Sequence, residues 1–358
     1  MKKPMNNINV CPVCNAEKND EGIACNNCGY EFAFCEFFGS EAAYAFFKKD
    51  VAEYRTLYIK NICGNSRDRG STLSVSGDRV AFYNAVANTV FTFYFGKDEP
   101  EIISDIKQVS LSGLYSVYLK NDGSLISAGD NESGQRRLDD LDNIVFVETT
   151  PKCTYAVRKD GTVAVRGISA LREEVEKWTD IKSISCEEEY AIGIKYDGST
   201  VYAATARSYI RNRLEAVSGF GNVIKVETDA YYMLALHADG TASYVGENNS
   251  IKTAVEGWSG ICDIVADGQY AVGLTSDGQI KTAGDYSPLI DFGRKEAGEW
   301  SDMAFIAEGR SVIAGITRTG ELKMAGLADN KSFVGAFNNL FYRELVKNKD
   351  TQAPTQGI

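Results

Sequence analysis

Trp178-Thr179-Asp180-Ile181 is one of seven copies of a short junction, in which an apolar residue, two small or polar residues and an aliphatic residue open a new apolar run. Successive copies begin 37 to 42 residues apart. A chain with such a period is an array of similar units, none of which can bury its apolar face alone. The other copies are Ile103-Ser104-Asp105-Ile106, Leu141-Asp142-Asn143-Ile144, Phe220-Gly221-Asn222-Val223, Trp258-Ser259-Gly260-Ile261, Trp300-Ser301-Asp302-Met303 and Phe337-Asn338-Asn339-Leu340.

A second landmark lies at a fixed place inside each unit, where an apolar run meets an Asp-Gly pair. Asp-Gly tolerates the positive φ that a two-residue hairpin needs, so the units consist of β-hairpins. The run from Ser74 to Gly96 parallels the run from Ser110 to Gly129 and supplies the first unit. Seven such units predict an all-β, seven-bladed β-propeller. The turns are Asp122-Gly123, Asp160-Gly161, Asp197-Gly198, Asp239-Gly240, Asp277-Gly278 and, with a substitution, Thr319-Gly320.

The two ends of the array look complementary. The first unit lacks a junction near Arg67 to Gly70, whereas the last junction, at Phe337, opens a strand-like run to Val346 with no unit behind it. We expect this run to supply the missing strand of the first blade and to close the ring. The alternative is a frayed C-terminal segment.

These motifs carry a family resemblance. The recurring Trp-Ser/Thr-Asp/Gly-Ile, the run from Tyr270 to Asp285, and Gly129-Asp130-Asn131-Glu132-Ser133-Gly134-Gln135 resemble bacterial-type repeats of the regulator of chromosome condensation family, over about three quarters of the chain. The resemblance implies a ring of seven four-stranded blades. It implies no single activity, because similar propellers serve as nucleotide exchange factors, enzyme inhibitors and adaptors.

The chain departs from the family pattern at one repeated position. The His that usually precedes the Asp-Gly turn by seven residues is Tyr in most units, and we see no match to the insertion used for nucleotide exchange. The resemblance therefore does not extend to that activity. The replacing residues are Tyr115, Tyr190, Tyr232 and Tyr270, with Cys153 and Val312 in the third and seventh units.

The N-terminal segment contains two CxxC pairs separated by ten residues, Cys11-Pro12-Val13-Cys14 and Cys25-Asn26-Asn27-Cys28. Four thiolates so paired can surround one tetrahedral zinc ion, and the segment resembles the short zinc ribbons of many bacterial proteins. The alternative is a redox pair or disulfides. We expect a structural Zn²⁺ with no open position for water, bound by Cys11, Cys14, Cys25 and Cys28.

One helical stretch separates the ribbon from the propeller. Ala43, Phe47, Val51, Tyr54 and Tyr58 recur at spacings of three and four, which is typical of an amphipathic helix. This apolar face either packs on the propeller or ribbon, or binds a partner. The predicted organisation is a zinc ribbon over 1–35, a helical linker over 36–64, the propeller over 65–346 and a tail over 347–358.

Composition sets the remaining bounds. The chain has 358 residues, is 44% hydrophobic, contains no apolar run as long as a membrane span, and opens without a secretory-type apolar stretch. Its net charge of −11 opposes generic binding to a phosphate backbone. We expect a cytoplasmic protein. The cysteines outside the ribbon are odd in number and are interpreted as small buried hydrophobes: Cys35, Cys63, Cys153, Cys186 and Cys262.

The fourth unit carries a local exception to the acidic composition. In its loop, cationic residues alternate with an aromatic one: Arg207, Tyr209, Arg211 and Arg213. The loop either binds an acidic partner or a nucleic acid, or it is a solvated surface loop. Trp178, Trp258 and Trp300 form either an aromatic binding ring or packing between blades. We take the loop as the candidate partner site.

Enzyme motifs are sparse in this sequence. The one histidine, His237, sits two residues before a hairpin turn, and no phosphate-binding loop ending in Gly-Lys-Ser/Thr is present. The prediction is a non-enzymatic protein-interaction module or adaptor that binds a protein partner through its propeller loops. The alternatives are a nucleic-acid-associated regulatory factor and a carboxylate-based enzyme.

Overall fold

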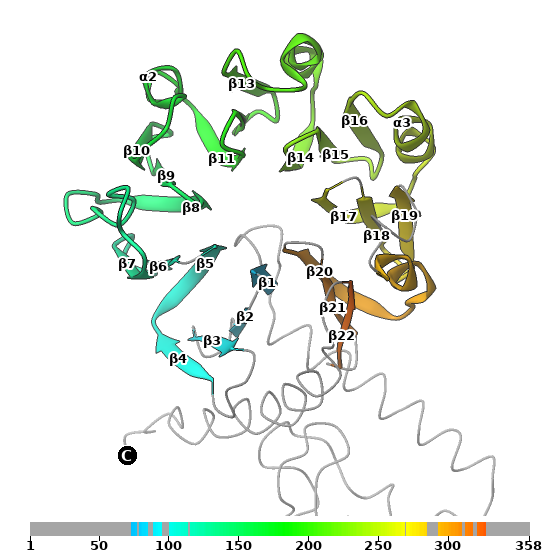
Figure 1. Cartoon of the computed structure of the whole chain (residues 1–358), viewed down its shortest axis with the longest axis horizontal. Coiled ribbons are helices and arrows are strands. Elements are labelled where there is room, and N and C mark those ends of the chain that lie inside the picture. Colours follow the sequence, from blue (N-terminus) through cyan, green and yellow to red (C-terminus); the bar gives the residue numbers. More distant parts are fainter. Residues whose placement is uncertain are drawn as a thin grey trace, which may run out of the picture.

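The chain folds into seven antiparallel sheets around one axis (Figure 1). The structure is a computed structural model that describes residues 73–76, 79–84, 89–94, 100–113, 115–268, 270–284, 293–309, 312–317 and 321–326. These residues confirm the predicted all-β, seven-bladed propeller. The expected zinc ribbon, the linker helix and the strand-like run from Phe337 to Val346 lie outside the described residues.

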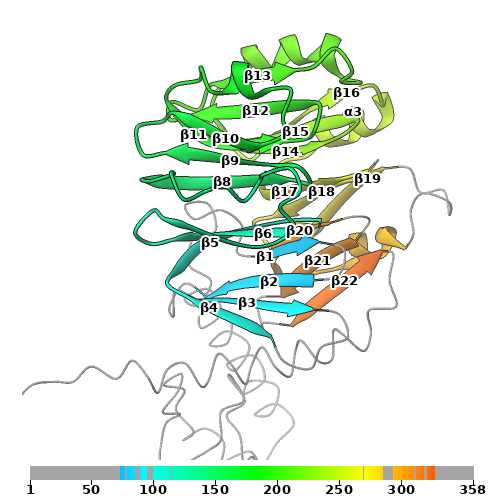
Figure 2. The same ribbon diagram turned by 60° about the vertical axis from the view of Figure 1, so that its left-hand side comes forward.

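The first sheet has four strands and each of the others has three, in the part of the chain that the structure describes. Turned by 60°, the sheets are seen as successive layers around the ring (Figure 2). The first sheet contains β1 (Leu73–Ser76), β2 (Arg79–Asn84), β3 (Thr89–Tyr94) and β4 (Glu101–Ser104); the others are β5–β7 (Ile106–Ser112, Tyr115–Lys120, Leu125–Gly129), β8–β10 (Ile144–Thr150, Cys153–Arg158, Val163–Gly167), β11–β13 (Ile181–Cys186, Tyr190–Lys195, Thr200–Ala204), β14–β16 (Val223–Asp229, Tyr232–His237, Ala242–Gly246), β17–β19 (Ile261–Asp267, Tyr270–Thr275, Ile280–Gly284) and β20–β22 (Met303–Glu308, Val312–Thr317, Leu322–Gly326).

Short helices follow the third strand in four blades, where the family resemblance implied a fourth strand. In α3 the buried residues Ile251 and Val255 are one helical turn apart, and Asn248 caps the helix by accepting the amides of Ser250 and Ile251. An apolar spacing of four with an Asn cap favours a helix over a strand. The helices are α2 (Arg172–Val175), η3 (Arg211–Gly219), α3 (Asn249–Glu256) and η4 (Arg294–Glu299).

The Asp-Gly pairs form hairpins as predicted, but the loop has three residues instead of two. In the second blade the Lys120 amide donates to the Ser124 carbonyl at 2.9 Å, and of the loop residues Gly123 alone has a positive φ, of 85°. Asp122 is not left-handed because its carboxylate accepts the Ser124 amide at 2.9 Å. The Thr319-Gly320 turn lies outside the described residues.

Each hairpin also fixes the start of the next unit. The third junction residue is left-handed, for example Asn143 at φ 54° and Asp180 at φ 61°, a conformation that Asn, Asp and Gly tolerate best. The following amide then donates to a hairpin glycine: Ile144 to the Gly123 carbonyl and Ile181 to the Gly161 carbonyl, both at 3.0 Å. The two recurring motifs of the sequence are therefore the two sides of one contact between units.

The three tryptophans pack inside the sheets. Trp258 is 7% exposed and lies against Gly273 of β18, where an added Cβ would stand 2.9 Å from the Trp258 Cε3 atom. Trp178 over Gly193 and Trp300 over Gly315 repeat this pairing. Where the junction residue is smaller, the glycine is replaced by alanine, because Phe220 packs in one cluster with Ala235 and Leu141 with Ala156. Of the two readings of these tryptophans, packing is confirmed.

The repeated tyrosines join neighbouring blades. The Tyr232 hydroxyl donates to the Tyr270 carbonyl at 2.8 Å, and the Tyr190 hydroxyl donates to the Tyr232 carbonyl at 2.6 Å. Tyr115 donates to the Cys153 carbonyl in the same way, at 2.7 Å. The side chains of all four repeat tyrosines, including Tyr270, are buried. In these three units the tyrosine is therefore structural, and its hydroxyl acts as a bridge to the next unit. The Tyr270 hydroxyl donates instead to the Arg294 carbonyl of its own unit, at 3.2 Å.

The ring closes between its first and last described blades. β1 contacts β20, and Gly309 approaches the backbone of Val75 so closely that a Cβ there would overlap it. The innermost strands of all seven blades thus surround one central space. Within the described residues, no helix is long and apolar enough to cross a membrane.

Candidate functional site

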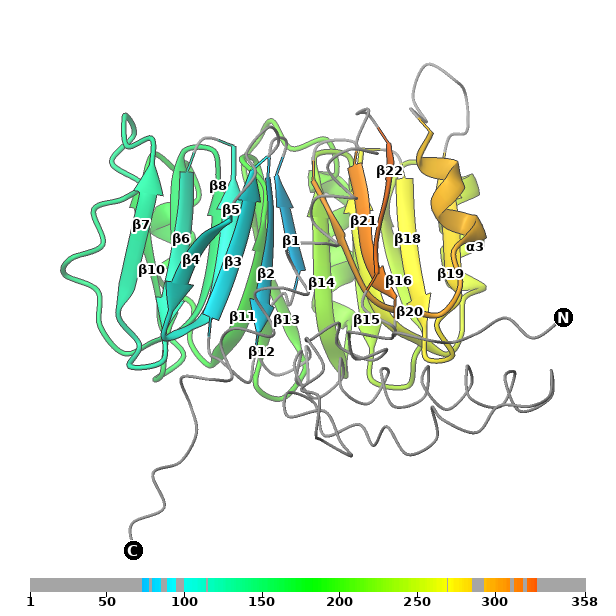
Figure 3. The same ribbon diagram turned by 90° about the horizontal axis from the view of Figure 1, so that it is seen from below.

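The strands run roughly along the ring axis, so the propeller has two distinct ends (Figure 3). We call the end where each innermost strand turns into the second strand the turn face. The opposite end, with the Asp-Gly hairpins and the junctions, is the hairpin face. β13 ends at the turn face, because its last residue, Ala204, pairs with Tyr190, the first residue of β12. The loop that follows β13 therefore leaves from the turn face.

This loop contains the predicted partner-binding residues, and all four side chains are exposed: Arg207, Tyr209, Arg211 and Arg213. Arg211 donates to the Ala204 carbonyl at 2.8 Å, which ties the start of η3 to the end of β13. Among the described residues, Arg213 makes one long ion pair, 3.9 Å from its Nε atom to Glu247. Three guanidinium groups thus lie along one edge of the turn face with most of their donors directed to solvent.

A tyrosine of the next blade completes this surface. Tyr231 lies in the turn between β14 and β15 and is 48% exposed, and its ring centroid is 5.2 Å from that of Tyr209, which is 69% exposed. Tyr231 was not predicted from the sequence. The available signal was the pair Tyr231-Tyr232: because Tyr232 occupies the buried repeat position, its neighbour has to point outward.

The second candidate region is a cavity of about 630 Å³ on the ring axis, lined by the innermost strands of all seven blades. Residues that end these strands occupy equivalent positions, as their pairing with the second strand shows: Ser76 faces Arg79, Ser112 faces Tyr115, Asp229 faces Tyr232 and Asp267 faces Tyr270. The cavity lining therefore changes character around the ring. At this strand-end position, serine and threonine line the cavity in the first three blades, and carboxyl groups line it in the next three.

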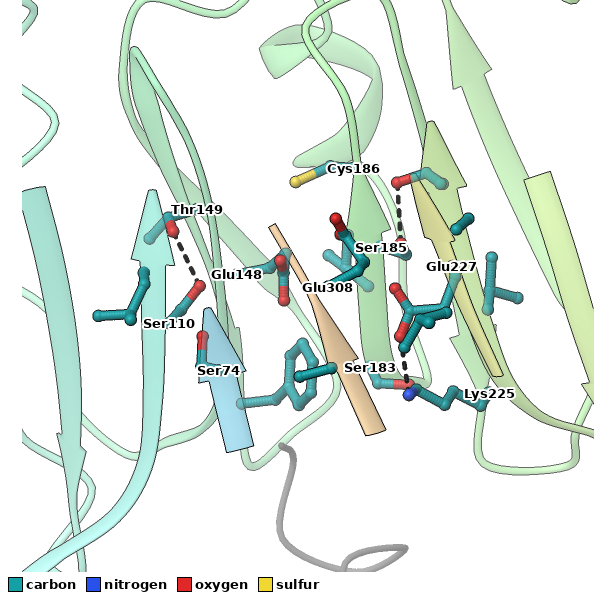
Figure 4. Close-up of a pocket in the computed structure, with 18 of the residues that line it drawn as sticks. Ser74, Ser110, Glu148, Thr149, Ser183, Ser185, Cys186, Lys225, Glu227 and Glu308 are labelled. Atoms are coloured by element: carbon teal, nitrogen blue, oxygen red, sulfur yellow. Dashed lines mark hydrogen bonds and ion pairs between the residues drawn. The ribbon is translucent and has the colours of Figure 1, made fainter. Parts of the chain in front are cut away.

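Carboxyl groups project into the cavity from several blades. Figure 4 shows Glu148 of β8, Glu227 of β14 and Glu308 of β20 around one space, with Cys186 of β11 beside Glu148. Hydroxyl pairs bridge two of the blade boundaries, Ser110 to Thr149 at 2.8 Å and, behind Glu227, Ser185 to Thr228 at 2.9 Å. None of the described residues forms an ion pair with Glu148, Glu187 or Glu308.

Burial in the ring raises the pKa of these carboxyl groups. The pKa of Glu148 is raised to about 8 by burial and then by the charge of Glu227, and that of Glu187 to about 8 by burial and then by Asp229. Burial and the nearby Asp267 hold the pKa of Glu308 well above its usual range. Glu148 and Glu187 therefore carry a proton for most of the time at neutral pH.

Lys225 compensates one side of the cavity. Its Nζ atom lies 2.6 Å from Asp263 and 2.8 Å from Glu227, and it donates to the Ile264 carbonyl at 2.9 Å. Burial alone would lower the pKa of Lys225, but the two carboxylates outweigh burial and raise it. Asp267 is neutralised separately by the buried Arg294, at 2.8 Å. Among the described residues, no cation pairs with Glu148, Glu187 or Glu308 on the other side of the cavity.

The other chemically active side chains of the described residues have structural roles. His237 accepts or donates at Ser243 and Gly221 beside a hairpin. Cys153 and Cys186 are buried, as expected, whereas Cys262 is half-buried. No group of three His, Cys, Asp or Glu side chains within the described ranges could hold one metal ion. The four ribbon cysteines lie outside those ranges.

Comparison with known proteins identifies the fold. No family model matches the chain, and no curated protein matches its sequence. The CRINKLY WD40 ectodomain of the Arabidopsis thaliana receptor kinase ACR4 superposes with a TM-score of 0.57 at 12% identity, over 72% of this chain and 95% of that one. The ectodomain of the Physcomitrella patens receptor kinase CR4 gives 0.53 at 12% identity, over 72% and 73%. Prp20p from Saccharomyces cerevisiae gives 0.49 at 12% identity, over 63% and 74%. At such identities the two ectodomains share the propeller fold with this chain, and the likeness carries no activity with it.

Proposed function

We propose that this chain is a non-enzymatic protein-interaction module that binds a protein partner at the turn face. The observation that supports the proposal is the solvent-exposed ring contact Tyr209–Tyr231, tilted at 41°, which extends over two blades beside Arg207, Arg211 and Arg213. Tyrosine and arginine are the residue types in which interface energy concentrates. An exposed aromatic pair flanked by guanidinium groups is an unusual feature for a chain of net charge −11.

The chemistry of this surface indicates an acidic partner segment with at least one apolar or aromatic side chain. Arginine pairs with carboxylates through two parallel hydrogen bonds, and the tyrosine rings bury apolar area at a low cost in side-chain entropy. Arg213 is available for such a pair because its 3.9 Å contact with Glu247 is long for a salt bridge and both side chains are at least half exposed.

The test is a pull-down with the full-length protein from cells of its native host, before and after nuclease treatment. R211A/R213A and Y209A are expected to weaken capture of a nuclease-resistant protein at least about tenfold each, since loss of an interface hot spot costs about 2 kcal/mol or more. The control variant K177A removes an exposed cation from the junction after α2, at the hairpin face, and is expected to bind normally.

Two outcomes would contradict the proposal. Equal capture by wild type and R211A/R213A would show that the loop is only solvated. Capture that disappears with nuclease would favour the nucleic-acid-associated alternative instead.

A further inference from the structure

We infer that the axial cavity is a binding site for an organic cation, whose ammonium or guanidinium group is held by Glu148, Glu187 and Glu308. This site is separate from the tyrosine–arginine surface of the turn face and does not depend on the proposed function. The ligand is either a free amine or a basic side chain of a partner, because both present the same chemical group to the cavity.

The first support is the charge balance of the lining. Lys107 and Lys182 line the cavity at the start of β5 and β11, toward the hairpin face, and Lys225 is already shared between Glu227 and Asp263. Toward the turn face the innermost strands contribute carboxyl groups but no lysine or arginine. Glu148 and Glu308 lie on opposite blades and both project into the same space (Figure 4). A cation placed between them gains charge-assisted hydrogen bonds that no described residue supplies.

The second support is a pair of unsatisfied hydroxyl groups in the same lining. Ser76 and Ser112 are 5% and 8% exposed and line the cavity; within the described residues their side chains form no hydrogen bond, and their hydroxyl oxygens are accessible from the cavity. They occupy the ring position at which later blades carry Asp229 and Asp267. Hydroxyl groups that open onto the cavity can accept from a ligand, so these two serines, opposite a group of carboxyls, suit a ligand with several N–H donors.

The geometry favours an organic cation over a metal ion. No three carboxyl or thiol groups of the described residues converge on one point, as a divalent metal would need. The acceptors are instead distributed around a cavity of about 630 Å³, which lies in the size range of small-molecule sites. A guanidinium with five donors in a fixed fork, or an amine with a second charged end, can reach acceptors on several blades at once.

Binding of a cation at this place is coupled to proton release. Glu148 is faced by Cys186 of β11 and by Glu187, which follows β11, by Lys225 and Glu227 of β14, and by Glu308 of β20. β1 and β5 present hydroxyl groups at this level, and Lys107 and Lys182 line the cavity nearer the hairpin face. Its raised pKa and that of Glu187 mean that protons must leave when a positive charge arrives. Affinity is therefore expected to rise from pH 6.5 to pH 8.5, whereas carboxylates of ordinary pKa would give no change over this range.

The experiment is isothermal titration calorimetry of the full-length protein with two probes. Agmatine represents a free amine, and the peptide Ac-Gly-Arg-Gly-NH2 represents a partner's side chain; both keep their charge up to pH 8.5. We expect at least one probe to bind roughly fivefold or more tightly at pH 8.5 than at pH 6.5, with protons released to the buffer. The variant E148Q/E308Q is expected to reduce affinity at pH 8.5 at least about tenfold, because it removes two charge-assisted acceptors.

The matched control is E173Q, which removes one exposed carboxylate from α2 on the outer edge of the ring. Glutamine has the shape of the protonated acid, so E148Q/E308Q is expected to fold, and its melting curve verifies this. Tighter binding of agmatine assigns the site to free amines, and tighter binding of the peptide assigns it to a partner. No binding of either probe, binding that does not change with pH, or equal loss in E173Q would overturn the inference, as would binding of Mg²⁺ or Ca²⁺ in place of both probes.

Discussion

Replacing Gly273 by alanine should create a steric clash in the core of the sixth blade and destabilise the protein. The new Cβ would stand 2.9 Å from the Trp258 Cε3 atom and 3.2 Å from the Ile261 Cδ1 atom, well inside ordinary contact distance. Trp258 is buried, so the indole ring has little room to move. Overpacking of this kind costs about 1–3 kcal/mol, which corresponds to a fall in melting temperature of roughly 2–10 °C for a domain of this size.

The chain itself supplies a rescue for this variant. The fifth blade combines Phe220 with Ala235 at the equivalent positions, so G273A/W258F reproduces a pair that already packs in this protein. W258F alone should destabilise by about 1–3 kcal/mol through the space that it leaves. The double variant should lose less than the sum of the single variants, by about 1 kcal/mol or more.

Thermal and urea unfolding followed by circular dichroism measures all three variants. G219A serves as the control because an added Cβ there meets nothing within 4 Å, and it should change stability by less than about 0.5 kcal/mol. If G273A unfolds like G219A, or if the losses of the double variant are simply additive, the size matching between junction and second strand is refuted.

Three other predictions follow from the inter-blade contacts, the cavity and the CxxC pairs. Y232F removes the hydroxyl that donates to the Tyr270 carbonyl and should cost about 1–2 kcal/mol, whereas Y196F at an exposed site should be neutral in the same unfolding assay. In the folded protein Glu148 and Glu187 hold their protons up to about pH 8, whereas in the unfolded chain they lose them near the ordinary pKa of glutamate. The free energy of unfolding should therefore fall as the pH rises from about 5 to 8 and then level off. The variant E148Q/E187Q should flatten this slope, and an identical slope in the variant would contradict the assignment. The purified protein should contain one zinc per chain by metal analysis, and C25S should lose it; zinc-free wild type isolated without chelator would refute the four-cysteine site.

The fold was predictable because its signals repeat in register. Six left-handed positions, from Asp105 to Asp302, and the hairpin glycines recur every 37 to 42 residues, and each carries a backbone requirement that few residue types meet. The loop length was not predictable from Asp-Gly alone, because the choice between two and three residues depends on the hydrogen bonds that the aspartate makes, as Asp122 does with Ser124. Helices in place of fourth strands were also missed, since the apolar positions of α3 are few and its cap stands outside the repeat.

The candidate sites were predictable only in part. The sequence pattern identified the Arg207–Arg213 loop from its composition, but not Tyr231, which becomes its neighbour only when two blades stand side by side. The axial carboxyl group cluster had no local signal at all. Glu148 and Glu308 are 160 positions apart in the sequence, and each looks like an ordinary polar residue within its own strand. Only closure of the ring brings them to one space and raises their pKa values.

Each contact between a hairpin and the following junction joins residues that are close in the sequence. Gly123 holds Ile144 and Gly161 holds Ile181, so neighbouring blades can be joined as soon as the next few strands have been synthesised. The seam between β1 and β20 is different, because it joins Val75 to Gly309 across nearly the whole described chain. This step therefore costs more loop-closure entropy than the closure of any one of the other boundaries. An open, crescent-shaped intermediate with six joined boundaries should accumulate before the ring closes, and closure of the seam should set the rate of folding.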